Sequence, residues 1–151
     1  MSQAAPRIDL DTSLGYLLKQ ASSALHTSME EVLRPLGMNI THYSCLELLA
    51  QRPGLSNSEL ARGAFVTRQS MNVLLHSLER DGIVMRPSRA EAGRALPTKL
   101  TAKGRAQLAA ASAAVRGVED RMKSDLSAAE RTSFGDMLAR CVESLRTDGA
   151  A

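Results

Sequence analysis

Residues 55–84 read LSNSELARGAFVTRQSMNVLLHSLERDGIV, and they contain the most specific structural pattern of the chain. Ser56 is followed three residues later by Glu59, which is the pattern of a capping box at the start of a helix. Gly63 closes that short helix, and after the three-residue link AFV, Thr67 is placed to cap a second helix. Two short helices joined by a tight link form a helix-turn-helix, whose second helix is able to enter the major groove of duplex DNA.

The second helix of this motif has one apolar face and one polar face. Its apolar positions recur at steps of three and four, and they are Met71, Leu74, Leu75 and Leu78. The opposite face carries Gln69, Asn72 and His76, with Val73 beside them. Glutamine and asparagine are able to pair with adenine through two hydrogen bonds, and an exposed apolar side chain can meet a thymine methyl group. We therefore expect this helix to read base edges.

Two short extended runs follow the second helix, Ile83–Ser88 and Ala95–Leu100, with a polar tip between them. This pattern predicts a β-hairpin, and its prolines are tolerated only because both strands are short and exposed at an edge. The hairpin carries Arg86, Arg89 and Arg94. We expect these arginines to grip the adjacent DNA backbone or to enter a narrow minor groove.

Longer helices are predicted on both sides of this centre. The first covers about 12–34 and is capped by Asp11, Thr12 or Ser13, and the second covers 40–52 and is capped by Asn39 or Thr41. A third helix covers 101–125, and a last helix begins with the capping pattern of residues 127–130. Their apolar stripes are Leu14, Leu18, Ala21, Leu25 and Val32; Tyr43, Leu46 and Leu49; Leu108, Val115, Val118 and Met122; and Phe134, Leu138, Cys141 and Leu145. These stripes exceed what one small monomer can cover, so we expect a dimer.

Composition narrows the class of protein. The 151 residues fit one domain, and 44% of them are hydrophobic but only 3% aromatic, which favours helices. Between residues 62 and 105 nine Lys and Arg stand against three Asp and Glu, so the centre is basic and suited to a polyanion. No apolar run approaches the roughly 20 residues that span a bilayer, and residues 1–10 lack the pattern of a secretory signal. A cytoplasmic protein is the expectation.

Four segments carry a resemblance to a known family. LSNSELA (residues 55–61) is similar to the start of that family's first motif helix, and VTRQSM (66–71) with LERDGIV (78–84) looks like its recognition helix running into the wing. LTAKGR (100–105) looks like the Leu-Thr-x-x-Gly signature that closes the wing. In this order and spacing the chain resembles the MarR family of winged helix-turn-helix transcriptional regulators.

The resemblance implies a mainly α fold with a small β-hairpin, built as four helices, a β-wing and two long helices. It covers nearly the whole chain, and the first and last helices form a helical dimerisation region. The implied organisation is a single domain over 11–147 between two flexible tails, 1–10 and 148–151. Within the domain, the dimerisation helices lie at about 12–34 and 102–147, and the winged helix-turn-helix lies at about 39–101.

The implied function is a sequence-specific regulator of transcription that binds double-stranded DNA, without enzyme activity or a cofactor. It is a ligand-responsive repressor that acts as a homodimer on a pseudo-palindromic operator, with a small aromatic or phenolic effector and no membrane partner. The residues expected to contact DNA are Ser56, Ser58, Thr67, Arg68, Gln69, Ser70, Asn72, Val73, His76, Arg86, Arg89 and Arg94. The residues expected to line an effector pocket are Leu17, His42 and Cys45.

Two positions depart from the family pattern. The family wing usually has an Asp two residues before its Arg, and here Ala92 precedes Arg94. Val73 stands where many relatives carry Arg. Ala92 bears on the conformation of the wing and on its depth in the groove, and Val73 bears on one expected phosphate or base contact.

Other functions are weaker readings of the same residues. None of the three histidines lies in a metal or nucleophile motif, which argues against an enzyme. His42 and Cys45 lie three apart on one helix, so they suit a metal or an oxidation-sensing regulator that acts through Cys45, although a partly buried His and a packed Cys are the commoner arrangement. A winged-helix protein–protein interaction module is the remaining alternative. Such a module would be expected to carry an apolar or acidic surface in place of the polar and basic residues of the second motif helix and the hairpin.

Overall fold

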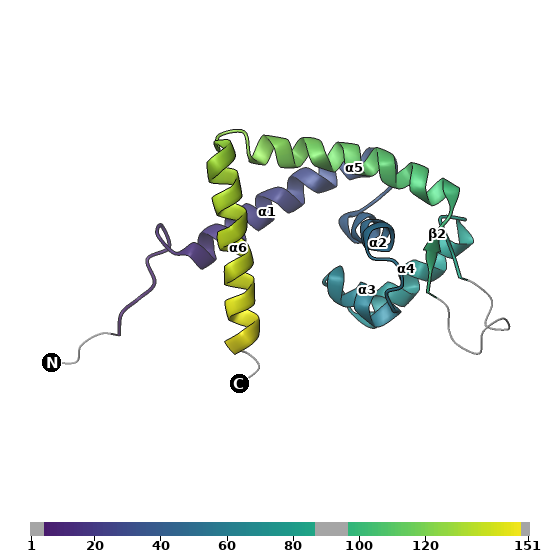
Figure 1. The fold of residues 1–151 in the computed structure, drawn as a ribbon, viewed down its shortest axis with the longest axis horizontal. Helices are drawn as coiled ribbons and strands as arrows, with labels where there is room; N and C mark the ends of the chain where they lie inside the picture. Colours follow the sequence, from purple (N-terminus) through teal and green to yellow (C-terminus); the bar gives the residue numbers. More distant parts are fainter. Residues whose placement is uncertain (1–4, 87–96, 149–151) are drawn as a thin grey trace. The chain divides into compact units, whose positions relative to one another are not determined.

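The computed structural model describes residues 5–86 and 97–148, which are mainly helical with one small hairpin (Figure 1). The elements are α1 (Leu14–Leu33), the 3-10 turn η1 (Arg34–Leu36), α2 (Ile40–Gln51), α3 (Asn57–Gly63), α4 (Arg68–Arg80), β1 (Val84–Met85), β2 (Lys99–Leu100), α5 (Ala102–Met122) and α6 (Ala128–Asp148). This order confirms the predicted four helices, β-hairpin and two long helices. The chain divides into two compact units, Met1–Arg116 and Gly117–Ala151, so the end of α5 and all of α6 belong to the second.

Side-chain caps determine where α1 and α2 begin. Of the three candidate caps for α1, Ser13 is the one used, because its Oγ accepts a hydrogen bond from the Tyr16 N–H at 3.3 Å. The cap of α2 is Asn39, whose Oδ1 accepts a hydrogen bond from the His42 N–H at 2.8 Å. Between the two helices, Gly37 adopts a left-handed backbone with φ 72°, which ends the turn η1 before α2 begins.

The predicted capping box at the start of α3 is present. Ser56 Oγ accepts a hydrogen bond from the Glu59 N–H at 3.2 Å, and Glu59 Oε1 accepts one from the Ser56 N–H at 3.0 Å. At the other end of α3, Phe65 adopts a left-handed backbone with φ 59°, and the Val66 N–H donates to the Ala61 carbonyl at 3.0 Å. This arrangement closes the helix tightly, so α4 begins within a few residues.

One hydrophobic core holds the first unit together. Its fully buried side chains come from α1, α2, α3 and α4, and they are Leu33, Cys45, Leu46, Leu60, Met71 and Leu75. The first half of α5 adds Leu108, Ala111 and Val115. The predicted inner face of α4 is confirmed, with Leu78 also buried and Leu74 half-buried. Tyr43, expected in the core, is only half-buried and packs against its edge.

The hairpin strands are shorter than predicted over the described residues. The strands form an antiparallel ladder in which Val84 pairs with Leu100 and Met85 with Lys99. Ile83 does not join the strand, because its N–H closes the end of α4 on the Leu78 carbonyl at 2.9 Å. Pro97 has no N–H to donate to a ladder. The prediction of strands over 83–88 and 95–100 is therefore wrong at these described positions.

The end of α5 also differs from the prediction. The helix ends at Met122 rather than near Asp125, because the chain enters a tighter turn in which the Leu126 N–H donates to the Lys123 carbonyl at 2.9 Å. The capping box predicted at residues 127–130 is present, with reciprocal hydrogen bonds of 2.9 and 3.1 Å, and it starts α6.

A close approach of two backbones fixes where α5 leaves the hairpin. Thr101 Oγ1 donates to the Gly82 carbonyl at 2.6 Å and accepts from the Gly104 N–H at 3.0 Å, so it caps α5 and ties the helix to the end of α4. A Cβ on Gly104 would lie 2.1 Å from the Ile83 carbonyl oxygen, which is backbone and cannot move aside. The Thr-x-x-Gly signature is thus a packing requirement.

Replacing Gly104 with alanine should lower the free energy of unfolding by about 2–4 kcal/mol, since the methyl group forces the two backbones apart. Gly117→Ala is the matched control in the same helix, because a Cβ there meets nothing within 4 Å. That control should raise stability by up to about 1 kcal/mol through helix propensity. Denaturant unfolding followed by circular dichroism measures both variants, and equal effects of the two would contradict the packing argument.

Candidate nucleic-acid interface

The start of α4 is organised by its own side chains. Thr67 Oγ1 accepts a hydrogen bond from the Ser70 N–H at 3.0 Å and donates to Ser70 Oγ at 2.9 Å. The two residues, predicted as DNA contacts, therefore build the cap of the helix while remaining exposed. The unpaired N–H groups of the first turn and the positive end of the helix dipole together suit a phosphate group.

The outward face of α4 carries the predicted reading residues. Gln69 and His76 are exposed, and Val73 is 66% exposed, while the opposite face is buried in the core. Asn72 is half-buried on the side of α4 that borders α3. The predicted orientation of the helix is confirmed.

Two side-chain hydrogen bonds join α4 to the first turn of α3. Arg68 Nε donates to Ser58 Oγ at 2.8 Å, which leaves the two terminal guanidinium nitrogens without a partner among the described residues. Asn57 Nδ2 donates to Asn72 Oδ1 at 2.9 Å. Three of these four residues were singled out from the sequence. Asn57 was missed, because nothing local to it indicates a contact fifteen residues away.

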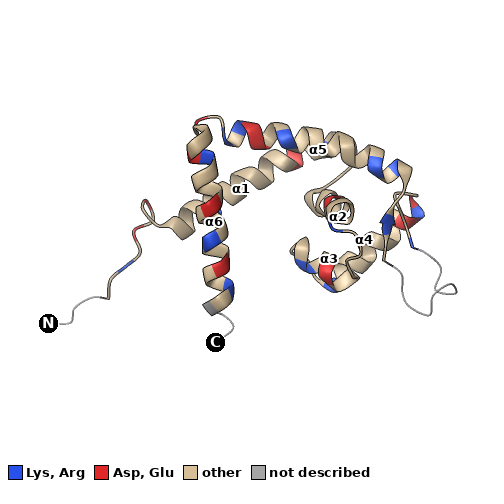
Figure 2. Ribbon diagram, in the orientation of Figure 1, with Lys and Arg blue, Asp and Glu red and all other residues tan. Residues whose placement is uncertain are grey.

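Of the three arginines predicted on the hairpin, Arg86 lies within the described residues, and its side chain lies against α4. Arg86 Nε lies 3.7 Å from Glu79 Oε2, and its Nε and Nη2 atoms are buried without a hydrogen bond. Figure 2 shows further Lys and Arg positions at the hairpin and at the start of α5. There, Lys103 Nζ donates to the Asp81 carbonyl at 3.0 Å and Arg105 Nη1 to the Leu100 carbonyl at 3.1 Å. Part of the basic charge thus holds the hairpin to the ends of α4 and α5.

The tip of the hairpin lies outside the described residues. Arg89 and Arg94, expected to grip DNA, belong to it, as does Ala92. Their proposed role rests on the sequence.

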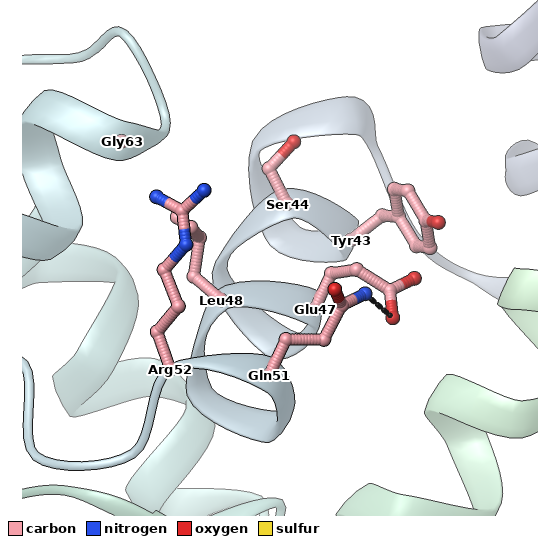
Figure 3. A pocket seen from close by; sticks show the side chains of 7 residues that line it. All are labelled: Tyr43, Ser44, Glu47, Leu48, Gln51, Arg52 and Gly63. Carbon is pink, nitrogen blue, oxygen red and sulfur yellow. Dashed lines mark hydrogen bonds between the residues drawn. The ribbon is translucent and has the colours of Figure 1, made fainter.

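The three residues predicted to form an effector pocket lie on α1 and α2. Leu17 is 45% exposed, His42 is half-buried, and Cys45 is completely buried. A separate shallow cavity of about 210 Å³ lies on another face of α2, and none of the three residues lines it (Figure 3). Its lining residues are Tyr43, Ser44, Glu47, Leu48, Gln51, Arg52 and Gly63.

Glu47 anchors the hydrogen-bond network beside this cavity. Its Oε1 accepts a hydrogen bond from Gln51 Nε2 at 2.9 Å (Figure 3). Its Oε2 accepts one from Ser112 Oγ of α5 at 2.8 Å. Partial burial raises the pKa of Glu47, but hydrogen bonds from Tyr43, Gln51 and Ser112 and the charge of Arg116 outweigh burial and lower it. The carboxylate therefore joins α2 to α5 in its charged form.

His42 faces Gln107 of α5 in a partly desolvated position. Burial lowers the pKa of His42 below its ordinary value, while the carboxylate of Asp81 and the side chain of Gln107 partly counteract this effect. Neither His42 Nε2 nor Gln107 Oε1 has a partner at hydrogen-bond geometry, so the two side chains make only a loose contact. The imidazole is neutral at pH 7 and leaves polar atoms unsatisfied.

The two cysteines differ in their surroundings. Burial raises the pKa of Cys45 to about 12, so its thiol stays protonated and unreactive at neutral pH. This finding argues against an oxidation sensor that acts through Cys45. Cys141 is exposed on α6.

No cluster of three or more His, Cys, Asp or Glu side chains within residues 5–86 and 97–148 is placed to hold a metal ion.

This architecture, with an exposed polar helix face held beside a hairpin, defines a winged helix-turn-helix regulator of transcription. A model of the MarR family matches residues 36–95. The HTH-type transcriptional repressor Rv2887 of Mycobacterium tuberculosis is 43% identical over 130 residues, which are 86% of this chain and 94% of the repressor. The chain belongs to the MarR family.

Solved structures of Rv2887 extend this likeness to the fold. Its complex with DNA has a TM-score of 0.72 at 41% identity, and covers 87% of this chain and 98% of Rv2887. Its complex with salicylic acid has a TM-score of 0.73 at 43% identity, and covers 87% and 97% respectively. Rv2887 is a transcriptional repressor, and it has been crystallised with DNA. No helix in the described part of this chain is long and apolar enough to cross a membrane.

The neutral, half-buried state of His42 makes the free energy of unfolding depend on pH. Because the folded protein holds the pKa below the unfolded value of about 6.5, the folded state binds fewer protons than the unfolded state under acidic conditions. The free energy of unfolding should therefore be highest above pH 6.5 and fall as the pH drops below it. His42→Gln should flatten this decline in urea titrations between pH 7.5 and 5.5.

His76→Gln is the matched control, since that imidazole is exposed to water. It should retain the pH dependence of the unaltered protein. An undiminished decline in His42→Gln would contradict the assignment.

Proposed function

We propose that this protein is a sequence-specific repressor that binds duplex DNA as a homodimer and releases it when a small aromatic ligand binds. This proposal rests mainly on the outward face of α4, where uncharged side chains able to form hydrogen bonds lie beside the helix N-terminus and a basic hairpin (Figure 2). Uncharged amides add little to non-specific attraction, so their value lies in reading base edges. The crystal structure of the relative Rv2887 with DNA supports this reading.

Homodimer formation is supported by apolar side chains that the single chain leaves exposed. On α1, Leu14 is 74% exposed and Leu18 is 41% exposed; on α6, Leu145 is 78% exposed and Phe134 is 44% exposed. Full burial of an exposed side chain of this size contributes about 1.5–3 kcal/mol, and Leu14 and Leu145 come nearest to that case, so a second copy is the natural cover. A stable, folded monomer at micromolar concentration in sedimentation would refute this part of the proposal.

The ligand is proposed to bind near Leu17, His42 and Cys45. The unsatisfied polar atoms of His42 and Gln107 would gain partners from the carboxylate or hydroxyl of an aromatic acid, against the apolar surface around them. Rv2887 has been crystallised with salicylic acid, which is a molecule of this class.

Salicylic acid should raise the melting temperature of the protein and weaken its binding to DNA. His42→Ala should remove most of the thermal shift, because it deletes the polar contact, whereas the exposed His76→Ala should keep it in the absence of DNA. Differential scanning fluorimetry over a panel of aromatic acids measures both variants. If no acid of the panel shifts the unaltered protein, regulation by this class of ligand is wrong.

Asn72→Ala should weaken binding to the preferred operator by about 1–3 kcal/mol while hardly changing binding to random DNA, because a neutral amide contributes through base contacts. Arg94→Ala is the contrasting variant. It should weaken binding to both DNAs and lower the slope of log K against log salt by about one unit for each phosphate that the arginine no longer neutralises. Fluorescence anisotropy over a salt series provides both quantities. Equal losses of affinity on the two DNAs for Asn72→Ala would show that α4 does not read bases.

A further inference from the structure

Phe65, in the turn between α3 and α4, combines two features that are unfavourable for an aromatic residue. Its side chain is 91% exposed, and its backbone is left-handed with φ 59°, which no other non-glycine residue within 5–86 and 97–148 shows. We infer that Phe65 contacts DNA, with its ring packed against the deoxyribose of the backbone beside the start of α4. This inference rests on the proposed function.

The left-handed backbone of Phe65 is built into the turn. The Phe65 N–H donates to the Arg62 carbonyl at 3.2 Å, and the Val66 N–H donates to the Ala61 carbonyl at 3.0 Å. These two bonds form a Schellman motif, whose left-handed position is usually glycine, because a side chain strains that backbone conformation. A turn that only joined α3 to α4 would be more stable with glycine at this position. The phenyl ring therefore does not serve the turn.

The ring does not serve the hydrophobic core either. Val66, the next residue, is partly buried and packs against the core, whereas the Phe65 ring is almost entirely in water. Single exposed hydrophobic residues are common on protein surfaces, and Leu145, which is 78% exposed in the regular helix α6, is one of them. Phe65 differs because its backbone is strained as well, and strained residues concentrate at binding sites.

The surroundings of Phe65 indicate a polyanion as its partner. Arg62 and Arg68 lie three residues before and after it, and both are exposed. No Asp or Glu occurs between residues 60 and 78. An apolar protein surface would cover the ring but offer no acceptor to the two guanidinium groups. A duplex backbone offers apolar deoxyribose between phosphates, so it suits the ring and both cations together.

Phe65 is close enough to the start of α4 for this contact. Thr67, which caps α4, is two residues further along the chain, so the two Cα atoms lie within about 8 Å of each other. The terminal guanidinium nitrogens of Arg68, the first residue of α4, have no partner among the described residues. A DNA strand that binds these nitrogens therefore passes within reach of the phenyl ring.

Two variants separate the ring from the backbone conformation. Phe65→Gly and Phe65→Asn both delete the ring, and both residues tolerate a left-handed backbone. Asparagine is included because glycine also loosens the turn. Phe65→Tyr keeps the ring and should bind DNA as the unaltered protein does. Affinity is measured by fluorescence anisotropy over a salt series, on the preferred operator and on random DNA.

Deoxyribose is the same at every base pair, and the ring carries no charge. Phe65→Gly and Phe65→Asn should therefore bind both DNAs about fivefold more weakly for each bound subunit, which is the effect of exposing part of a phenyl ring. The slope of log K against log salt should stay unchanged, because no phosphate loses its cation. This combination differs from the losses expected for a residue that reads bases and for one that neutralises phosphates.

The same substitution should make the protein more stable while it weakens DNA binding. Phe65→Gly should raise the melting temperature by about 2–4 °C, because glycine relieves the strain of the left-handed conformation. Ile8→Asn is the matched control, since it removes another exposed apolar side chain, which is 76% exposed and remote in sequence from α3 and α4. It should change neither the affinity for DNA nor the salt slope.

Unaltered affinity of Phe65→Gly and Phe65→Asn, or a changed salt slope, would overturn the apolar contact with DNA. Sedimentation of these variants as monomers, at a concentration where the unaltered protein is a dimer, would assign the ring to an interface between copies and would overturn it too. Failure of the unaltered protein to bind any duplex would instead overturn the proposed function.

Discussion

The joint between α3 and α4 is the constraint on which the proposed DNA reader depends. A helix of seven residues is too short to be stable in water by itself, so α3 exists only because its ends are capped and its apolar side is buried. Leu60 and Met71 are completely buried in the same core, and the Asn57–Asn72 and Ser58–Arg68 bonds tie the polar rims together. The face of α4 is therefore preorganised, and binding need not order it.

A second close contact holds the hairpin to this joint. Thr101 and Gly104 bring the start of α5 directly against the backbone at the end of α4, and Lys103 bonds the carbonyl of Asp81. The hairpin leaves from this point, so its direction follows that of α4. The core side chains of α5 then cover α2 and its neighbours. One short region of the chain thus sets the relation between the recognition helix and the wing.

Local signals made most of the fold predictable from the sequence. Capping patterns at Ser56 and at residues 127–130 depend on neighbouring residues, and the structure confirms them. The strands were predicted too long because apolar alternation does not reveal that the Ile83 N–H is taken by the end of α4. The apolar stripe on α5 likewise does not reveal where the turn after Met122 begins.

The site was less predictable than the fold, for a physical reason. Polar positions on one face of α4 follow from helical periodicity, so Gln69 and His76 were placed correctly on the outside. The partner of each polar group depends on tertiary contacts that no spacing rule encodes. Asn57 was therefore missed, and the position of the Arg86 guanidinium beside the Glu79 carboxylate was not foreseen.

Selection of bound duplexes from a random DNA pool with the unaltered protein is the most direct test of base reading by α4. A homodimer that reads with α4 should enrich one pseudo-palindromic sequence, with half-sites about one helical turn apart, since the symmetry of the protein imposes symmetry on its site. Enrichment of a single, unrepeated half-site would contradict the dimeric reader. No enrichment over the starting pool would contradict base reading by α4 altogether.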